Sequence, residues 1–224
     1  MAMAPQAVED MEVKTREHLE SIKSRASKEG VQCESIVHEG EDTYKFIVDE
    51  AKKNNVNMIV MGRRGRKGLK RLMMGSVTAK TIGHSPCNVL VVPRTARIEG
   101  KVILIATDGS KYSELAAREA VYVAKGCGSK LIAVSVSSSE AEVKEAQNNV
   151  NKVRDMADRE GVKAEILTVI GMPYEAIVET AKKKNADLII MGSHGKTGLE
   201  RLLMGSVTER VIGLADGAVL VVKT

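Results

Sequence analysis

From residue 101 to the end of the chain, short continuous apolar runs alternate with longer stretches in which apolar residues recur at helical spacing. Continuous runs of this length are typical of strands that are buried on both faces of a sheet. The runs are KVILIAT (101–107), LIAVSV (131–136), AEILTVI (164–170), DLIIM (187–191) and AVLVV (218–222). The stretches between them predict helices over about Ser113–Lys125, from Ser139, with Glu142 in a possible capping box, to about Glu160, and from Pro173 to about Asn185. Five strands joined by helical crossovers imply an α/β fold with a parallel sheet covered on both faces.

The first part of the chain repeats only the later part of this plan. It predicts a helix from about Gln6 to Glu29, a strand VQCESIV (31–37), a helix around Thr43 to Asn54, and strands VNMIVM (56–61) and NVLVV (88–92). A shift of 130 residues aligns 44–94 on 174–224 without a gap, with 26 of 51 residues identical. We interpret this as a duplication. Residues 1–97 would form a partial domain that lacks the first two strands and the first helix, and residues 98–224 would form a complete one.

A glycine-punctuated stretch occurs once in each copy, between a predicted strand and a predicted helix. Its spacing is Gly, two residues, Gly, nine residues, Gly-Ser, and its members are Gly62, Gly65, Gly75 and Ser76 in the first copy and Gly192, Gly195, Gly205 and Ser206 in the second. This place is the carboxyl edge of a parallel sheet, where α/β folds bind ligands. Glycine there permits positive φ and a close approach of backbone amides to an anion, and Gly-Ser opens a helix. The stretch therefore predicts a phosphate cradle.

Spacing excludes two other phosphate motifs. Gly195-Lys196-Thr197 resembles the end of a Walker loop, but Ile190 stands where that motif needs a glycine. The turn after the first strand of the second copy reads ATDGS rather than GxGxxG. The chain is therefore expected to be neither a P-loop NTPase nor a dinucleotide dehydrogenase.

Positive charge is concentrated in the first copy. The net charge is +5, and residues 1–97 hold 17 Lys or Arg against 12 Asp or Glu, whereas residues 98–224 hold 17 of each. Within the first glycine stretch, six of the nine residues from 63 to 71 are basic, namely Arg63, Arg64, Arg66, Lys67, Lys70 and Arg71. This imbalance favours an anionic partner, although an ordinary solvated loop is an equal alternative. The candidate second anion site comprises Gly62, Arg63, Arg64, Gly65, Gly75 and Ser76.

Other residue types exclude several classes of protein. The three cysteines and four histidines lack the spacing of a metal site or a disulfide framework, so no metal is expected from the protein alone. Aromatic residues make up 2% of the chain, which disfavours nucleic acid as a partner because stacking platforms need them. No run approaches the roughly 18 apolar residues of a membrane helix. A cytoplasmic protein without a membrane partner is therefore expected.

Together, the G-2x-G-9x-G-S spacing, the TDGS turn after the first strand and the short apolar fifth strand resemble the universal stress protein family. The resemblance covers residues 98–224 entirely and the first copy from its second helix onward. It implies the Rossmann-like fold of the adenine-nucleotide α-hydrolase type, with a parallel five-stranded sheet of order 3-2-1-4-5. It also implies a stress-response regulatory protein that binds ATP, or AMP or ADP, with Mg²⁺ on the phosphates.

The resemblance carries the family's nucleotide-binding positions onto the second copy. Along adenine and ribose it places Ala106, Thr107 and Asp108, with Val136 as a wall of the base. Around ribose and phosphates it places Met191, Gly192, Ser193, His194 and Gly195, and it completes the phosphate cup with Gly205, Ser206, Val207 and Thr208. The first copy lacks counterparts of Asp108 and Val136. One complete nucleotide site per chain is therefore expected.

Several of these residues also have structural alternatives. Ser206 with Glu209 has the spacing of a capping box, so its hydroxyl could simply cap the last helix. Asp108 could be a turn or N-cap residue. Apart from His194 and Lys196, nothing suggests the groups that phosphoryl transfer needs, so no catalytic residue is predicted. A slow ATPase, or a protein that binds a polyanion or nucleic acid through the basic loop, remains the alternative function.

The fifth strands, NVLVV and AVLVV, have apolar edges that need covering. We expect them to pair, either within the chain as a pseudo-dimer or between chains as a homodimer. The strands missing from the first copy would lie between its third and fourth strands. That copy must therefore close the gap directly, borrow strands from another chain, or stay partly open.

Overall fold

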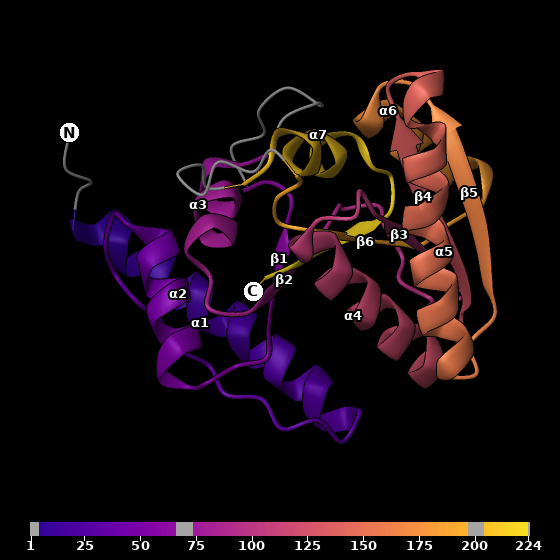
Figure 1. Ribbon diagram of the computed structural model, residues 1–224. Helices are drawn as coiled ribbons and strands as arrows, with labels where there is room; N and C mark the ends of the chain where they lie inside the picture. Colours follow the sequence, from indigo (N-terminus) through magenta and orange to yellow (C-terminus); the bar gives the residue numbers. More distant parts are fainter. Residues whose placement is uncertain (1–4, 66–73, 197–203, 224) are drawn as a thin grey trace. The chain divides into compact units, whose positions relative to one another are not determined.

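The computed structural model describes residues 5–65, 74–196 and 204–223, and the chain forms two compact units, Met1–Asp42 and Thr43–Thr224 (Figure 1). The basic residues Arg66, Lys67, Lys70 and Arg71 lie outside the described residues. In the first unit, helix α1 (Pro5–Lys28) is followed by an extended segment. The division into domains 1–97 and 98–224 stays a prediction, because one sheet runs through both copies in the second unit.

The second unit is built around a sheet in which the described residues form seven strands, in the order β1-β2-β7-β6-β3-β4-β5. The strands are β1 (Met58–Gly62), β2 (Asn88–Val92), β3 (Val102–Ala106), β4 (Lys130–Ser137), β5 (Ala164–Ile170), β6 (Leu188–Gly192) and β7 (Ala218–Val222). Strands β3 to β7 are parallel and follow the predicted order 3-2-1-4-5. The predicted fold of the second copy is confirmed.

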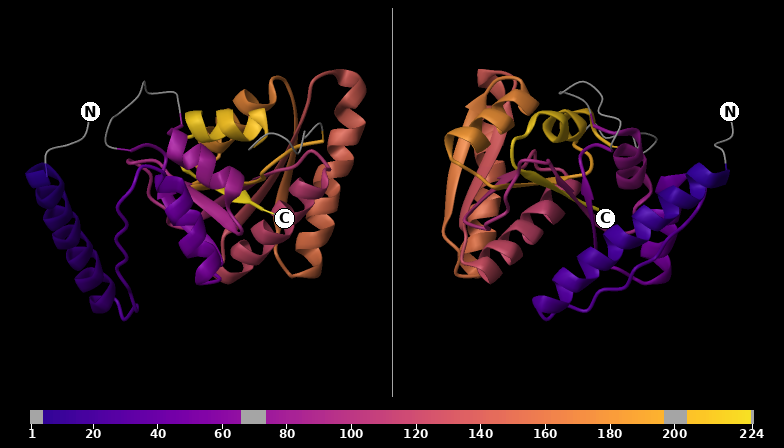
Figure 2. Two further views of the ribbon diagram at one scale, coloured as in Figure 1. Left: turned by 90° about the vertical axis from the view of Figure 1, so that its left-hand side faces the viewer. Right: turned by 180° about the vertical axis from the view of Figure 1, so that it is seen from behind.

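Helices cover both faces of this sheet (Figure 2). One face packs against α2 (Thr43–Lys53), α3 (Ser76–His84), α6 (Pro173–Lys183) and α7 (Ser206–Leu214). The other packs against α4 (Lys111–Cys127) and α5 (Val143–Arg159). A hydrophobic core lies on each face of the sheet, and successive side chains of a strand point to opposite faces. In β3, Leu104 lies in one core, and Ile103 and Ile105 lie in the other. Among the described residues, no helix is both long and apolar enough to cross a membrane.

The two copies are joined by an antiparallel pairing of their fifth strands. Val89, Leu90 and Val91 of β2 lie opposite Val221, Leu220 and Val219 of β7. All six are buried or half-buried, and the valines share one core with residues of both copies. This confirms the intrachain pseudo-dimer. It also rules out a homodimer through the fifth strands, because each of them already has a neighbour on both sides.

The strand predicted over residues 31–37 is wrong. That segment is extended but has no ladder partner among the described residues. Its counterpart β5 pairs with β4, and the first copy has no equivalent of β4 to offer. The glycines that flank the two segments nevertheless share their backbone angles, with φ of 72° at Gly30 and Gly161 and 154° at Gly40 and Gly171. The turns at both ends of the segment are therefore set by local sequence, whereas a strand also needs a neighbouring strand to which it can hydrogen-bond.

The capping box predicted at Ser139 is also wrong. Ser139 precedes a 3-10 turn (Glu140–Glu142), and its side chain makes no cap hydrogen bond. Instead, the carboxylate of Glu142 accepts hydrogen bonds from the N–H and the hydroxyl of Ser138, at 3.0 and 2.6 Å. The extra turn moves the start of α5 to Val143.

Strand β1 forms an exposed edge of the sheet. Its counterpart β6 is buried along its whole length under α4, whereas Val60 of β1 is 63% exposed and Met58 is 37% exposed. Within the described residues, β1 is therefore the edge of the sheet on the side of the first copy.

Two basic side chains, Arg63 of the first copy and Lys223 of the second, each cap the C-terminal end of a helix in the other copy. Nη1 of Arg63 donates hydrogen bonds to the carbonyls of Ile212, Gly213 and Ala215 at the end of α7, at 3.2, 3.1 and 2.8 Å. Nζ of Lys223 lies 3.4 Å from the carbonyl of Gly83 at the end of α3. Positive charge is stabilising at a helix C-terminus. The joint is therefore held by helix capping as well as by strand pairing.

We predict that Arg63→Ala lowers the free energy of unfolding by about 1–2 kcal/mol, because three carbonyls at the end of α7 lose their donor. Urea denaturation at neutral pH measures this loss. The matched control is Arg94→Ala, which removes an exposed arginine and should change the stability by less than about 0.5 kcal/mol. Equal losses in the two variants would contradict the capping role of Arg63.

Candidate functional site

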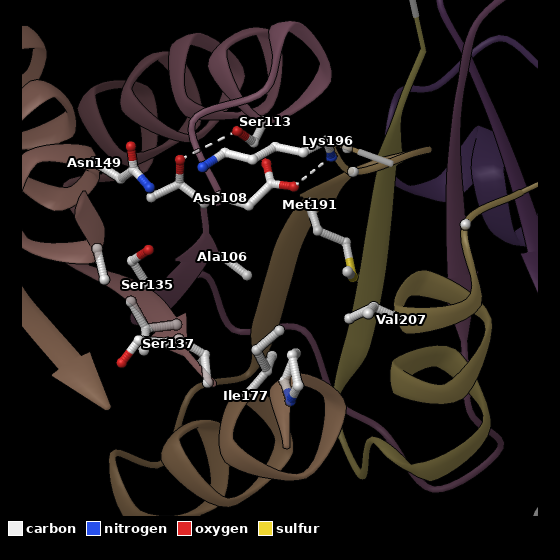
Figure 3. Close-up of a pocket in the computed structure, with 18 of the residues that line it drawn as sticks. Ala106, Asp108, Ser113, Ser135, Ser137, Asn149, Ile177, Met191, Lys196 and Val207 are labelled. Carbon is white, nitrogen blue, oxygen red and sulfur yellow. Dashed lines mark hydrogen bonds between the residues drawn. The ribbon is translucent and has the colours of Figure 1, made fainter. Parts of the chain in front are cut away.

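A cavity of about 650 Å³ opens at the carboxyl ends of β3, β4 and β6 and is closed by the first turns of α6 and α7 (Figure 3). All of the predicted site residues except Ser193 line it, namely Ala106, Thr107, Asp108, Val136, Met191, Gly192, His194, Gly195, Gly205, Ser206, Val207 and Thr208. These residues lie in several segments of the chain between Ala106 and Thr208. The parallel order of the strands brings the segments together. Whether these residues bind a ligand stays a prediction.

Asp108 fixes the glycine loop to the turn after β3. Its Oδ1 accepts the N–H of Ser110 at 3.0 Å, and its Oδ2 accepts the N–H of Lys196 at 2.8 Å. Burial raises the pKa of Asp108, but hydrogen bonds from Ser110, Lys196 and Ser113 outweigh it and hold the pKa below its usual value. The N-cap of α4 is Ser110, whose Oγ accepts the N–H of Ser113 at 3.2 Å. Asp108 is therefore a turn residue that is ionised at neutral pH and also lines the cavity.

The two glycines after β6 are required by packing. A Cβ on Gly192 would lie 2.7 Å from the backbone carbon of Tyr112, and one on Gly195 would lie 2.7 Å from Oδ2 of Asp108. Neither glycine adopts the positive φ that glycine permits, so close packing rather than backbone conformation explains them. In the first copy, a Cβ on Gly62 would meet only Arg64 at an ordinary 3.6 Å, and one on Gly65 would meet nothing within 4 Å. Among the described residues, the glycines of the first copy are therefore not required by packing as those of the second copy are.

The N-terminus of α7 faces the cavity. Gly205 is the N-cap and makes no side-chain cap, so Ser206 is the first helical residue and the predicted capping box with Glu209 is wrong. The first N–H groups of a helix have no partner within it and carry partial positive charge. The Thr208 hydroxyl donates to the carbonyl of Gly192 at 3.0 Å and holds the helix against β6. One end of the cavity is therefore lined by partially positive backbone N–H groups, which Ser206 and Val207 border.

Three other predicted residues have structural contacts. Ser193 is 2% exposed, and its Oγ lies 3.1 Å from Nδ1 of His194. The imidazole ring of His194 lies 5.2 Å from the ring of Tyr112. The Thr107 hydroxyl donates to Ser113 Oγ at 3.2 Å and accepts the N–H of Gly109 at 3.3 Å. These side chains support the loops around the cavity, and Ser193 lies beneath its lining.

Half of the lining residues were not predicted, and half of these come from β4 and α5. They include Ser113, Val134, Ser135, Ser137, Ser138, Glu142, Glu145, Ala146, Asn149, Pro173, Ile177 and Lys196. In sequence, the Glu and Asn residues of α5 are indistinguishable from the solvated face of an amphipathic helix. Only the packing of α5 beside β4 aims them at the cavity. Among the described residues, no group of three or more His, Cys, Asp or Glu side chains is placed to hold a metal ion.

The first copy has the same hydrogen bonds between the end of its strand and the start of the next helix as the second copy. Gly75 N–H donates to the carbonyl of Arg63 at 3.0 Å and Thr78 donates to Gly62 at 3.1 Å, as Gly205 and Thr208 do in the second copy. Gly75 likewise caps α3 without a side-chain bond, and Ser76 follows it. However, Nη1 of Arg63 is bound to the end of α7. A second anion site at Gly62, Arg63, Arg64, Gly65, Gly75 and Ser76 stays a prediction.

Comparison with known proteins yields one family. The sequence model described as "Universal stress protein family" matches residues 1–93 and again 100–223. Universal stress protein MJ0531 of Methanocaldococcus jannaschii is 44% identical over 139 residues, which are 55% of this chain and 82% of that protein. Universal stress protein Rv2005c of Mycobacterium tuberculosis is 30% identical over 190 residues, which are 76% of this chain, and the chain spans less than two thirds (63%) of its length. A solved universal stress protein from Archaeoglobus fulgidus has a TM-score of 0.81 at 26% identity, with 100% of this chain and 83% of that chain covered.

We predict that Gly192→Ala destabilises the protein by about 2 kcal/mol or more, because the new methyl group would overlap the backbone of Tyr112. Gly62→Ala is the matched control at the equivalent position of the first copy. There the methyl group has room, so the stability should stay within about 1 kcal/mol of the wild type or rise slightly. Thermal and urea unfolding measure both changes. Equal losses would show that the two glycine stretches are under the same constraint.

Proposed function

The chain belongs to the universal stress protein family, and we propose that the cavity of its second copy binds an adenine nucleotide, either ATP or a form with fewer phosphates. The observation that carries the proposal is the uncapped N-terminus of α7 at one end of an otherwise largely apolar cavity. A nucleotide has the same two-part character, with a flat base and an anionic tail. The volume of about 650 Å³ lies within the range of cofactor sites.

The base would lie against aliphatic side chains rather than on an aromatic platform. Val136 and Val134 come from β4, Ala106 from β3, and Met191 and Ile177 from the opposite wall. Their apolar surface favours a purine ring by burial and dispersion. Backbone groups at the strand ends would supply the polar contacts. This agrees with a chain that holds almost no aromatic residues.

The phosphates would lie at the first turn of α7. Ser206, Val207 and Thr208 contribute N–H groups there, and the close packing of Gly192 and Gly195 holds the loop in place before any ligand binds. Lys196 borders the same space. We propose that Mg²⁺ arrives on the phosphates, since Mg²⁺ needs few protein ligands when a polyphosphate supplies the others.

The proposal is a binding and regulatory role in the stress response, in the cytoplasm where ATP is abundant. Hydrolysis would need an oriented water and a charge clamp on the terminal phosphate. The predicted candidate base, His194, is packed against Tyr112, and Lys196 is paired with Glu145. Those contacts favour binding over turnover. A polyanion-binding role of the first copy has less support, because Arg63 is engaged at the end of α7.

We also propose that the protein forms a homodimer through β1. Within the described sheet β1 pairs with β2, so its other edge carries unpaired backbone groups beside the exposed Val60. An edge strand of this kind is a template for pairing with a second chain. Two copies of β1 can pair with each other about a twofold axis, as β2 and β7 already do within the chain.

We predict that Val60→Lys converts the dimer to a monomer, because a lysine on an edge strand opposes pairing. Light scattering after size-exclusion chromatography measures the mass. Tyr122→Lys, on the exposed face of α4, is the control and should leave the mass unchanged, since Tyr122 is 75% exposed. A wild-type protein that is monomeric at high micromolar concentration would refute the dimer.

We predict that isothermal titration with ATP and Mg²⁺ detects one site per chain. Ser206→Asp should weaken ATP binding at least about tenfold, because a carboxylate at the first residue of α7 would repel the phosphates. Ser76→Asp places the same charge at the equivalent position of α3 and should leave ATP binding unchanged. Both changes add an acid to a first helical turn, so neither should unfold the protein.

Three results would count against this proposal. Absence of binding at millimolar ATP would refute the nucleotide site. Two equal sites per chain would refute the difference between the copies. Equal effects of the two aspartates would place the ligand elsewhere than at α7.

A further inference from the structure

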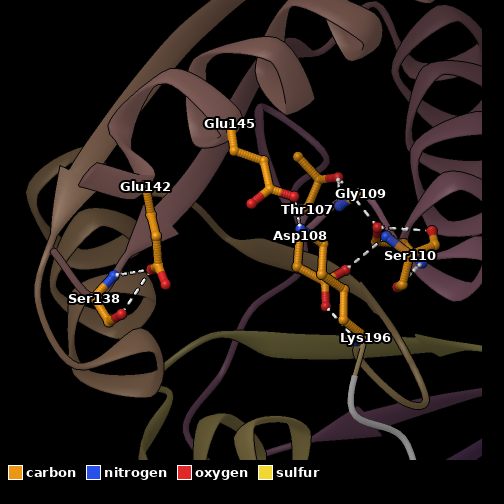
Figure 4. A network of polar contacts seen from close by, with 9 residues as sticks. Thr107, Asp108, Gly109, Ser110, Ser138, Glu142, Glu145 and Lys196 are labelled. Atoms are coloured by element: carbon orange, nitrogen blue, oxygen red, sulfur yellow. Dashed lines mark hydrogen bonds and ion pairs between the residues drawn. The ribbon is translucent and has the colours of Figure 1, made fainter. Parts of the chain in front are cut away.

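An ion pair joins two residues that line the cavity. Lys196, which follows Gly195 in the loop after β6, extends its ammonium group to Oε1 of Glu145 in the first turn of α5 (Figure 4). The backbone N–H of the same lysine donates to Asp108. The side chains of Lys196 and Glu145 are 43% and 61% exposed, and both residues line the cavity. The pair therefore connects two walls that belong to different strand–helix units.

The charges around this pair are mostly negative. Asp108, Glu142 and Glu145 line the cavity, and among the described lining residues Lys196 is the sole Lys or Arg. Hydrogen bonds from Ser138 hold Glu142 and lower its pKa, so it is ionised at neutral pH. The cation best placed to neutralise a phosphate is thus already neutralised by a carboxylate.

We infer that Glu145 weakens the binding of adenine nucleotides progressively as their number of phosphates rises, an inference that rests on the proposed nucleotide site. A polyphosphate that enters the cavity must either replace Glu145 as the partner of Lys196 or lie beside the acidic side chains of Glu142 and Glu145 with no other cation among the described lining residues to neutralise it. Either way, its binding loses part of the electrostatic gain that the end of α7 provides. Adenosine has no phosphate and is not subject to this competition. Glu145 therefore shifts the selectivity of the site from ATP toward less charged adenine compounds.

The size of the effect follows from the exposure of the pair. Exposed ion pairs contribute little, because water screens them and two flexible side chains must be ordered. Glu145 can therefore bias the ligand but cannot block the cavity. Its influence should grow with each phosphate, which distinguishes it from a steric gate.

The test is a titration of ATP, AMP and adenosine into the wild-type protein, Glu145→Gln and Glu142→Gln. We expect Glu145→Gln to bind ATP about three- to tenfold more tightly than the wild type, to gain less for AMP, and to bind adenosine within about twofold of the wild type. Glu142→Gln removes the same charge from the same wall, but Glu142 is hydrogen-bonded to Ser138 and acts on Lys196 only as a nearby charge, whereas Glu145 forms the ion pair with Lys196. It should stay within about twofold of the wild type for all three ligands.

Each other outcome has a definite meaning. Equal gains in the two variants would reveal a general effect of negative charge, and a gain for adenosine would reveal a change of shape; both would overturn the role of Glu145. An unchanged Glu145→Gln in a protein that binds ATP would overturn this inference and leave the nucleotide site intact. Absence of ATP binding in all three proteins would refute the nucleotide site and this inference together. Thermal unfolding confirms that the variants are folded.

Discussion

The antiparallel pairing of β2 with β7 is the contact on which the second unit depends. Strands β1 and β2 with two short helices would form a two-stranded sheet by themselves, which is too small to be stable in water. Joined to β7, they bury Val89 and Val91 in the same core as Val219 and Val221. Arg63 and Lys223 then cap helices of the opposite copy. An incomplete copy is thus folded by using the complete copy as its scaffold.

The same dependence explains why two nearly identical glycine stretches differ in role. Both copies keep the backbone contacts that hold the strand end against the next helix. In the second copy the turn after β3 and the start of α4 pack closely against Gly192 and Gly195. Among the described residues of the first copy, a Cβ on Gly62 or Gly65 would have room. The same local motif is therefore constrained differently by the fold around it.

Asp108 is both a charged residue of the cavity lining and a contact that holds two loops together. Its carboxylate holds the loop through the N–H of Lys196 and orders the turn that carries Ser110. The N-terminus of α7 and the acidic side chains of Glu142 and Glu145 line the same cavity as this ionised side chain. An apolar cavity with one positive end and one negative rim is suited to a ligand that it holds and discriminates by charge.

The α/β class, the strand order of the second copy, the duplication and half of the residues that line the cavity could be predicted from the sequence. These follow from apolar periodicity, from the repeat and from a family resemblance, which all lie along the chain. The prediction was wrong where a feature needs a partner from elsewhere: the segment 31–37 is no strand because no described strand lies beside it. Ser206 is no N-cap because Gly205 takes that position and Ser206 is the first residue of the helix. Only the tertiary structure decided that Arg63 caps α7 and that Glu145 holds Lys196. Contacts between residues far apart in the chain leave no periodicity, because they arise only when packing brings those residues together.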